Sequence, residues 1–322
     1  MEKPSLTIII PAYNVGDSLA KCVESVISQD FLQWQAIIID DGSTDNTLDI
    51  ANNLAEKDTR ITVLHKDNGG LSDARNHGLD LLFGIISCGD SSLFPNTPYV
   101  TFIDSDDYIS PSTLGPLMHE LNIHPEYDLL EYSATLYSGS KRETLLTLPD
   151  TIYISPKDYW LRGRGYCHSY SWNKIYRNTI FSSGLRFPKG KIFEDVWMLP
   201  HILKACKTVV TTTKGRYVYM DNPKGITHSA NHSASLLAQL LHAQIEAMRL
   251  LEIDISAPSL SKDEARLYLS LRNQQTTIKR LDPNHPAVLP IRRIPFSAAT
   301  TIREFIKVLY YRCTDLFLTK TK

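Results

Sequence analysis

Apolar and polar residues along the first 110 positions are arranged as strands that alternate with helices. Four short, continuous apolar runs predict buried strands, at residues 6–10, 36–39, 61–64 and 99–103. Between them, apolar residues at helical spacing predict helices over 17–29, after Asp45, and over 72–83. Continuous apolar strands separated by helices predict an α/β fold with a mostly parallel central sheet and helices on both faces.

The rest of the chain is mixed at first and then helical. From 111 to 230 the pattern predicts two helices and three strands, at 112–121, 194–204, 129–137, 209–212 and 216–219. Further on, apolar stripes predict three helices, near 236–251, 267–278 and 300–318. We therefore predict two halves of one α/β domain, 1–110 and 111–230, and a helical C-terminal extension, 231–322. Residues 84–98, where Gly, Ser, Pro and Asn gather, predict a surface loop.

Composition argues against several classes of protein. The formal net charge of −1 gives no overall field that would attract nucleic acid, so no nucleic-acid partner is expected. The five cysteines are scattered and form no CxxC pair, which argues against a zinc site and a disulfide framework and fits a reducing cytoplasm. The chain has no run of about 18 apolar residues, so no transmembrane helix is predicted. The apolar run at 6–10 is too short for a signal peptide, and we expect a cytoplasmic protein.

Three polar segments come directly after predicted strands. They are residues 11–14 (PAYN) after the first strand, Asp40-Asp41 after the second, and Asp104–Asp107 after the fourth. In open parallel sheets, ligands bind beyond the carboxyl ends of the strands. The three segments are therefore expected to meet at one edge of the sheet and to form a binding site there.

The acidic cluster carries the clearest chemical signal, because three carboxylates fall within Asp104-Ser105-Asp106-Asp107. A buried, unpaired carboxylate is costly, so a strand that ends in clustered acids is a poor way to build a core. Carboxylate oxygens suit Mg²⁺ or Mn²⁺, and such ions usually also hold a substrate phosphate. The alternative, an acidic turn in which Asp107 caps the next helix, leaves two acids unexplained.

The Asp40-Asp41 pair allows two interpretations. A carboxylate at this strand end could accept a hydrogen bond from a base N–H or a ribose hydroxyl, and Gly42 would permit a tight turn. Alternatively, the turn serves only to cap the following helix through Ser43 or Asp45. Capping accounts for one polar residue but not for the doubled Asp.

Two further segments also allow a structural and a functional interpretation, and for the second of them capping is the simpler one. Gly69-Gly70 opens a helix whose N-terminus favours anions, and Arg75 on that helix would add a cationic fork for a phosphate or a base. The alternative is a capped helix with Arg75 in solvent. Glu194-Asp195 precedes an apolar helical stretch; these acids could cap that helix, or Asp195 could act as a general base.

Four segments, in this order and spacing, resemble glycosyltransferase family 2, which has the GT-A fold. They are TIIIPAYNVGDSLAKCVESVISQ, IIIDDGSTDNT, KDNGGLSDARNHGL and YVTFIDSDDYISP. A weaker resemblance continues through SWNKIYRNTIFSSGLRFPKGKIFEDVWMLPHIL and YVYMDNPKGITH, and it is to the acceptor half of bacterial enzymes that build capsule, O-antigen or exopolysaccharide. The resemblance implies a Rossmann-like nucleotide-diphospho-sugar transferase. The 84–98 loop is longer than the connection usual in the family.

On the donor side, the resemblance implies a nucleoside pocket at the first two strand ends. Pro11, Ala12 and Tyr13 would line this pocket. Asp41 would bond the base, typically uracil, and Asp40 belongs to the same turn. The expected partner is a nucleoside-diphosphate sugar.

The remaining motif residues would carry the chemistry. Arg75 would lie near the base or the diphosphate. Asp104-Ser105-Asp106 would be the DxD motif that holds Mn²⁺ or Mg²⁺, with Asp106 the direct ligand and Asp104 near the ribose or the metal. Asp195 would be the catalytic base that takes a proton from the acceptor hydroxyl.

The expected activity is inverting, metal-dependent transfer of a sugar, with a UDP-sugar as the first candidate donor. The acceptor would be a hydroxyl of a glycan or lipid-linked acceptor in cell-surface polysaccharide biosynthesis. Two alternatives from other classes remain. A nucleotidyltransferase would need a glycine-rich, basic triphosphate loop, and residues 11–20 supply only Gly16 and no Lys or Arg. A non-catalytic sugar-nucleotide-binding protein would have no need of the acids.

The last predicted helix, at 300–318, combines an apolar stripe with basic residues. Such a helix can lie on an anionic membrane, which would suit a lipid-linked acceptor on the inner face of the cell membrane. It could equally be a packed terminal helix with a solvated charged face, or part of a homo-oligomer interface.

Overall fold

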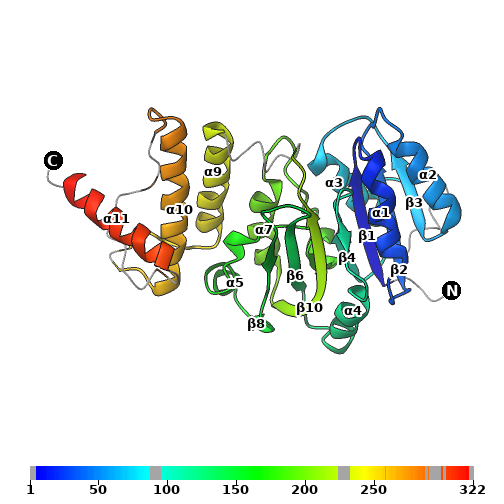
Figure 1. Cartoon of the computed structure of the whole chain (residues 1–322). Helices are drawn as coiled ribbons and strands as arrows, with labels where there is room; N and C mark the ends of the chain where they lie inside the picture. The colour runs from blue at the N-terminus through cyan, green and yellow to red at the C-terminus, as the bar shows by residue number, and fades with distance from the viewer. Residues whose placement is uncertain are drawn as a thin grey trace. The chain divides into compact units, whose positions relative to one another are not determined.

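The computed structural model describes residues 5–87, 96–223, 233–257, 259–286, 289, 299 and 302–318. The chain divides into two compact units (Figure 1). Unit 1 is formed by Met1–Pro156 and Tyr170–Pro223, and unit 2 by Lys157–Ser169 and Lys224–Lys322. All the described strands belong to unit 1. Residues 88–95 of the predicted surface loop lie outside the described residues, and the predicted boundaries near 110 and 230 stay predictions.

The first part of unit 1 alternates strands and helices as predicted. Its elements are β1 (Leu6–Ala12), α1 (Gly16–Ile27), β2 (Trp34–Asp40), α2 (Thr47–Lys57), β3 (Ile61–His65), α3 (Leu71–Leu82) and β4 (Tyr99–Phe102). The strands pair in parallel in the order β3-β2-β1-β4. The polar segments that follow β1, β2 and β4 therefore lie at the same edge of the sheet.

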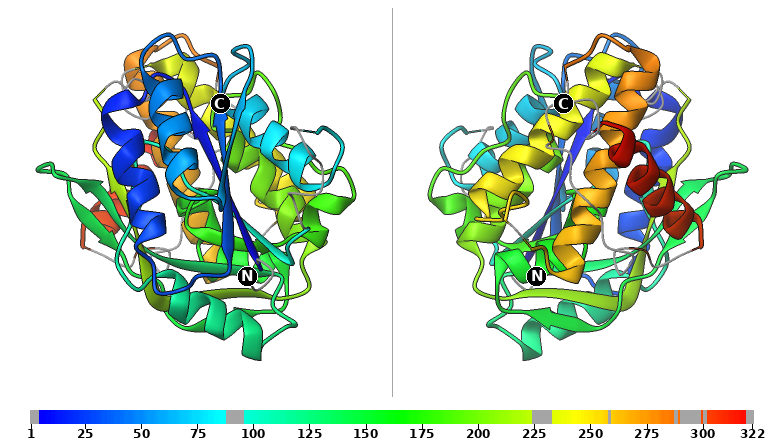
Figure 2. Two further views of the ribbon diagram at one scale, coloured as in Figure 1. Left: turned by 90° about the vertical axis from the view of Figure 1, so that its right-hand side faces the viewer. Right: turned by 90° about the vertical axis from the view of Figure 1, so that its left-hand side faces the viewer.

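Helices cover both faces of these strands (Figure 2). Successive strand residues point to opposite faces. Ile8 and Ile38 accordingly share a core with α1 and α2, whereas Ile37 and Ile39 pack with residues of α3. Close packing of α3 depends on Gly78, where an added Cβ would lie only 2.5 Å from the Ile9 side chain.

The second part of unit 1 extends the same sheet. Its strands are β5 (Tyr108–Ile109), β6 (Leu129–Ser138), β7 (Thr144–Leu146), β8 (Thr151–Tyr153), β9 (Lys174–Arg177) and β10 (Val209–Met220). Its helices are α4 (Leu114–Ile123), α6 (Thr179–Ser182) and α7 (Glu194–Ala205). The order of the whole sheet is β3-β2-β1-β4-β9-β6-β10-β5, with β7 beside β6 and β8 beside β10.

The prediction of a mostly parallel sheet holds for only part of this arrangement. β9 runs antiparallel to both β4 and β6, while β10 is parallel to β6. β9 has only four residues and no clear periodicity, so the sequence pattern did not reveal it. The two strands predicted at 209–212 and 216–219 form a single strand, β10, with a register shift between Thr212 and Tyr217. The sheet is therefore mixed, as in many large sheets.

Unit 2 is helical. Its elements are α5 (Pro156–Leu161, which begins at the end of unit 1), the short 3₁₀ turn η2 (Gly165–Cys167), α9 (Ala234–Leu250), α10 (Lys262–Leu281) and α11 (Ile302–Leu318). Helices α9 and α10 pack side by side (Figure 1). α10 begins with a capping box in which Ser261 and Glu264 exchange hydrogen bonds. No helix in the described part of the chain has the length and apolar character needed to cross a membrane.

Helix α11 packs through one face and exposes another that is apolar. Val308 and Tyr311 are buried, and the Tyr311 hydroxyl bonds Asn273 and Thr276 of α10. Five large apolar side chains of α11 are 47–82% exposed, namely Ile302, Phe305, Ile306, Leu309 and Tyr310. Helix α11 is therefore packed, as the interpretation of a packed terminal helix predicted. Its solvent face, however, carries large apolar side chains as well as charges.

Candidate active site

Arg75 of α3 is the centre of the site. Its guanidinium is 1% exposed. Nη1 donates to Glu194 Oε1 at 2.7 Å and to Asp195 Oδ1 at 3.1 Å, and Nη2 donates to Asp104 Oδ1 at 2.7 Å. The end of β4 and the start of α7 are thus held together through one side chain. The alternative of a solvent-exposed Arg75 is wrong.

The electrostatics around Arg75 are those of a buried cation with excess anions. Burial alone would lower the pKa of Arg75, but the three carboxylates raise it overall. Burial raises the pKa of Asp104, and the neighbouring Asp106 and Asp195 add to this effect. Burial, together with Asp195, also raises the pKa of Glu194 to about 7. The site therefore favours an additional positive charge near these carboxylates.

Asp107 is anchored to β10 and does not cap a helix. Its carboxylate accepts hydrogen bonds from the Tyr217 hydroxyl and from the Met220 backbone N–H, both at 2.8 Å. The capping interpretation is therefore wrong for this residue. Asp106 accepts a bond from Asn222 Nδ2 at 3.0 Å, and Ser105 between the acids is buried.

The turn after β1 is tied to the turn after β2. Asn14 Oδ1 accepts the backbone N–H of Thr44 at 2.8 Å, and the Asn14 N–H donates to the Ser43 hydroxyl at 3.0 Å. Asn46 precedes helix α2 but makes no side-chain capping bond. Asp45 Oδ1 instead accepts the backbone N–H of Thr47, the first residue of α2, at 3.0 Å, as the capping interpretation of Asp45 predicted. Pro11 and Ala12 are buried in β1, while the Tyr13 ring is 49% exposed at the sheet edge.

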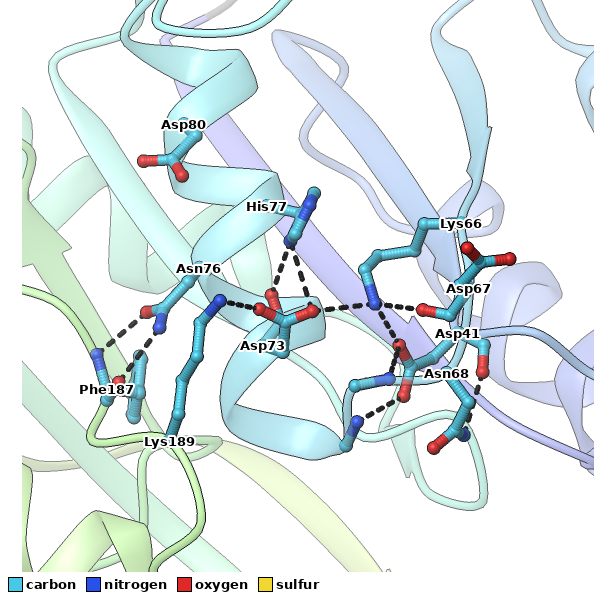
Figure 3. A network of polar contacts seen from close by, with 12 residues as sticks. Asp41, Lys66, Asp67, Asn68, Asp73, Asn76, His77, Asp80, Phe187 and Lys189 are labelled. Carbon is cyan, nitrogen blue, oxygen red and sulfur yellow. Dashed lines mark hydrogen bonds and ion pairs between the residues drawn. The ribbon is translucent and has the colours of Figure 1, made fainter.

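Asp41 organises the loop that leads into α3 (Figure 3). Its Oδ1 accepts from Lys66 Nζ at 2.5 Å and from the Gly69 N–H at 3.0 Å, and its Oδ2 accepts from the Gly70 N–H at 2.7 Å. The adjacent Asp40 is fully buried and its Oδ2 lies 2.6 Å from His65 Nδ1.

Lys66 connects this loop to α3. Figure 3 shows its Nζ between Asp41 and Asp73, and it lies 2.7 Å from Asp73 Oδ2. Asp73 also pairs with Lys189, and Asn76 exchanges two hydrogen bonds with the backbone of Phe187. Lys66 was not among the predicted residues, although a basic residue directly after β3 and before the glycines was a visible signal.

Asp195 is held on its other side by Ser171. The Ser171 hydroxyl donates to Asp195 Oδ1 at 2.6 Å, and the Ser171 backbone N–H donates to Oδ2 at 3.2 Å. No feature of the sequence distinguished Ser171 from other serines. The structure thus brings Arg75, Asp104 and Asp195 together, while Asp41 belongs to a separate network centred on Lys66.

The comparisons with known proteins agree with this architecture. Residues 7–130 match the family model described as Glycosyl transferase family 2. The chain carries a glycosyltransferase family 2 domain. The chain is 31% identical over 228 residues to the uncharacterized glycosyltransferase YibD of Escherichia coli K12, covering 67% of this chain and 62% of YibD. Across four such curated relatives, the chain spans only 33 to 63% of their length.

Solved structures share the GT-A fold of this family 2 domain. The S. aureus TarS fragment 1–349 in complex with UDP-GlcNAc has a TM-score of 0.59 at 17% identity, covering 95% of this chain and 79% of that fragment. The mannosyltransferase PcManGT of Pyrobaculum calidifontis, in complex with GDP-Man and Mn²⁺, has a TM-score of 0.51 at 14% identity, covering 98% of this chain and 88% of that one. The predicted fold class is confirmed.

The acids of the family 2 domain have the free oxygens that a divalent cation requires. The described residues form no group of three or more His, Cys, Asp or Glu side chains placed to hold a metal. Mg²⁺, however, usually binds through one or two carboxylates and completes its shell with water and substrate phosphate. Asp104 Oδ2 and Asp106 Oδ1 accept no hydrogen bond from the described residues. The pair therefore fits a metal that is bound together with a diphosphate.

Proposed function

We propose that this protein is an inverting, metal-dependent glycosyltransferase. It would move a sugar from a nucleoside-diphosphate sugar, a UDP-sugar in the first instance, to a hydroxyl of a glycan or lipid-linked acceptor in cell-surface polysaccharide synthesis. The observation that carries the proposal is the convergence of Asp104 and Asp195 on Arg75, because it brings a donor-side acid and a candidate base to one point of a family 2 domain. The UDP-GlcNAc bound to TarS supports the class of donor.

The first step is to hold the donor. Asp104 and Asp106 would hold Mn²⁺ or Mg²⁺, which when bound would offset the negative charge of the diphosphate leaving group. Arg75 would lie near the diphosphate, and its buried Nε has no hydrogen-bond partner among the described residues. Asp41 Oδ2 accepts only one bond from the described residues and can accept another from a base N–H. Tyr13 would flank the nucleoside.

The second step is to activate the acceptor. Asp195 would accept the proton of the acceptor hydroxyl as that oxygen attacks the anomeric carbon from the face opposite the diphosphate. The bond to the diphosphate oxygen breaks with its electron pair, so the configuration inverts. Arg75 Nη1 lies 3.1 Å from Asp195 Oδ1 and so helps to hold in place the carboxylate that would act as the base.

The test is a screen of nucleotide sugars for turnover with Mn²⁺ or Mg²⁺, followed by two variants. Asp106→Asn should lose metal-dependent donor binding. Asp195→Asn should bind the donor normally and lose roughly 10²- to 10⁴-fold in transfer rate. Absence of binding and turnover with every donor would refute the proposal, and normal transfer by Asp195→Asn would refute the assigned base.

We further propose that α11 rests on the anionic inner face of a membrane. Residues 302–322 carry five basic and two acidic side chains, which suits an anionic surface. Five apolar side chains of α11 are exposed beside these charges, as a helix lying on a membrane surface requires. A helix of this kind would lie in the headgroup region of the bilayer, parallel to its surface, without crossing the membrane.

Flotation with vesicles of anionic or zwitterionic lipid tests this contact. The full chain should float with anionic vesicles, and the double change Phe305→Ser/Leu309→Ser should abolish flotation. The control is Ile154→Ser, which removes an even more exposed apolar side chain, from unit 1. The proposal would be contradicted if the full chain did not float with anionic vesicles. It would also be contradicted if the chain were a dimer in solution that the double change dissociated into monomers.

A further inference from the structure

The two carboxylate oxygens of Asp195 differ in their surroundings. Oδ1 accepts a short bond from the Ser171 hydroxyl at 2.6 Å and a second from Arg75 at 3.1 Å. Among the described residues, Oδ2 accepts only the Ser171 backbone N–H, at 3.2 Å. A carboxylate oxygen has two lone pairs that can accept hydrogen bonds. Both are used on Oδ1, so Oδ2 is the oxygen that has a lone pair left for an acceptor hydroxyl.

We propose that Ser171 is a positioning residue that fixes the Asp195 carboxylate with Oδ2 toward the acceptor hydroxyl. This inference rests on the proposed function and adds a residue to it. The terminal torsion of Asp is broad, so the carboxylate needs an external restraint to hold one orientation. Arg75 cannot supply this restraint alone, because the same guanidinium also binds Glu194 and Asp104. The hydroxyl and the backbone N–H of Ser171 each donate a hydrogen bond to one oxygen of Asp195. Together these two bonds fix the plane of the carboxylate.

Ser171 can act in this way because its own backbone is fixed. It is 3% exposed, and its carbonyl accepts the Tyr176 hydroxyl at 3.1 Å. The preceding carbonyl, that of Tyr170, accepts Lys174 Nζ at 2.6 Å. Lys174 is in turn paired with Glu131 at 2.7 Å, and both side chains are fully buried. The segment 170–174 is therefore held by strands β6 and β9 of the sheet, as a rigid support for a functional side chain should be.

A purely structural role for the Ser171 hydroxyl makes a different prediction. Loss of a buried hydrogen bond would lower the stability of unit 1 and would leave the turnover of the folded protein unchanged. Loss of a positioning bond would lower kcat while donor binding stays intact, since Ser171 contacts the base and none of the residues proposed to bind the donor. Rescue by Thr, which retains a hydroxyl, further separates the two roles.

The experiment compares Ser171→Ala and Ser171→Thr with the intact protein, using the donor and acceptor found in the screen. We expect kcat for transfer to fall roughly 10- to 100-fold in Ser171→Ala, with donor KM and calorimetric donor Kd unchanged. Ser171→Thr should recover most of the rate. Ser171→Cys, which keeps the volume but donates weakly, is the second variant if Ser171→Ala does not fold. The matched control is Ser169→Ala, another buried serine, whose hydroxyl bonds the Gly165 carbonyl at 2.9 Å.

The outcomes separate this inference from the proposed function. Suppose that the intact protein transfers the sugar and that Asp195→Asn does not. If Ser171→Ala and Ser171→Cys then keep full kcat, only the positioning role of Ser171 is overturned. An equal loss of rate in Ser169→Ala would also overturn it, because the effect would then be one of general stability. If the intact protein turns over no nucleotide sugar, the proposed function fails and this inference fails with it.

Discussion

Replacing Arg75 with Met is the most informative single change to this fold. Met fills a similar volume and removes the charge and all five N–H donors. Asp104, Glu194 and Asp195 would then remain in a buried site without the cation that binds them. Removing one partner of a buried ion pair typically costs about 3–5 kcal/mol, because the other partner is left buried and unpaired. We expect a loss in the free energy of unfolding of about this size.

The loss should depend on pH in a defined direction. Burial already raises the folded-state pKa of Asp104 and places that of Glu194 at about 7, and removal of Arg75 raises both further. A carboxylate whose folded pKa lies above its unfolded value favours folding at low pH, and this contribution is lost as pH rises through the folded pKa. The destabilisation of Arg75→Met should therefore be smallest near pH 5 and largest above about pH 8.

Urea unfolding of the metal-free chain at pH 5 and pH 8 measures both effects. The control is Arg186→Met, which removes a partly exposed ion pair to Asp80 at 2.8 Å and two hydrogen bonds to the carbonyls of Phe181 and Leu185. That change should cost about 1–2 kcal/mol, because partly exposed ion pairs and hydrogen bonds contribute little. If Arg75→Met costs no more than Arg186→Met at pH 8, or if its cost grows toward pH 5, the electrostatic reasoning about this site is wrong.

Three further changes test other parts of unit 1. Lys174→Met should cost about 3–5 kcal/mol by leaving the buried Glu131 without its ammonium partner, and adding Glu131→Leu should recover much of the loss in a double-mutant cycle of urea unfolding. Gly78→Ala should cost about 1–3 kcal/mol, because the new Cβ would lie 2.5 Å from Ile9; thermal unfolding should show less than additive losses when it is combined with Ile9→Ala. Glu194→Gln should flatten the fall in stability of the metal-free chain between pH 4.5 and 7, since the titrating carboxylate is gone.

The sequence was sufficient to predict those features that depend on local pattern. The continuous apolar runs of β1 and β2 and the helical spacing of α1 identified the elements, and parallel pairing then placed the acids after β4 at the ligand-binding edge. Strand direction in the second part of the sheet was not predictable in this way. β9 is a four-residue strand whose antiparallel pairing depends on both neighbours, β4 and β6, which local periodicity does not record.

The partners of the site residues were also beyond the reach of local pattern. Arg75 lies in the polar stretch SDARN, which suggests an exposed helix face. It is buried instead, because the carboxylates that pair with it lie 29 and about 120 residues further along the chain. Asp107 belongs to an acidic run that suggested metal binding or a cap, but its anchor is β10, more than 100 residues further on. Asp104 and Asp106 could be proposed from the sequence because clustered carboxylates at a strand end need a reason, whereas Asp195 could be singled out only through the resemblance to the family.

The shared contacts of Arg75 have a consequence for how the two halves of the site work together. Asp104 belongs to the proposed donor side and Asp195 to the proposed acceptor side. Both carboxylates accept hydrogen bonds from the same guanidinium, that of Arg75. A change in the charge of either acid alters the field and the hydrogen bonding that Arg75 offers to the other. The effects of substituting Asp104 and Asp195 on the free energy of unfolding should therefore be non-additive in the intact chain, and this coupling should change once Arg75 is Met, when only the direct repulsion between the two acids remains.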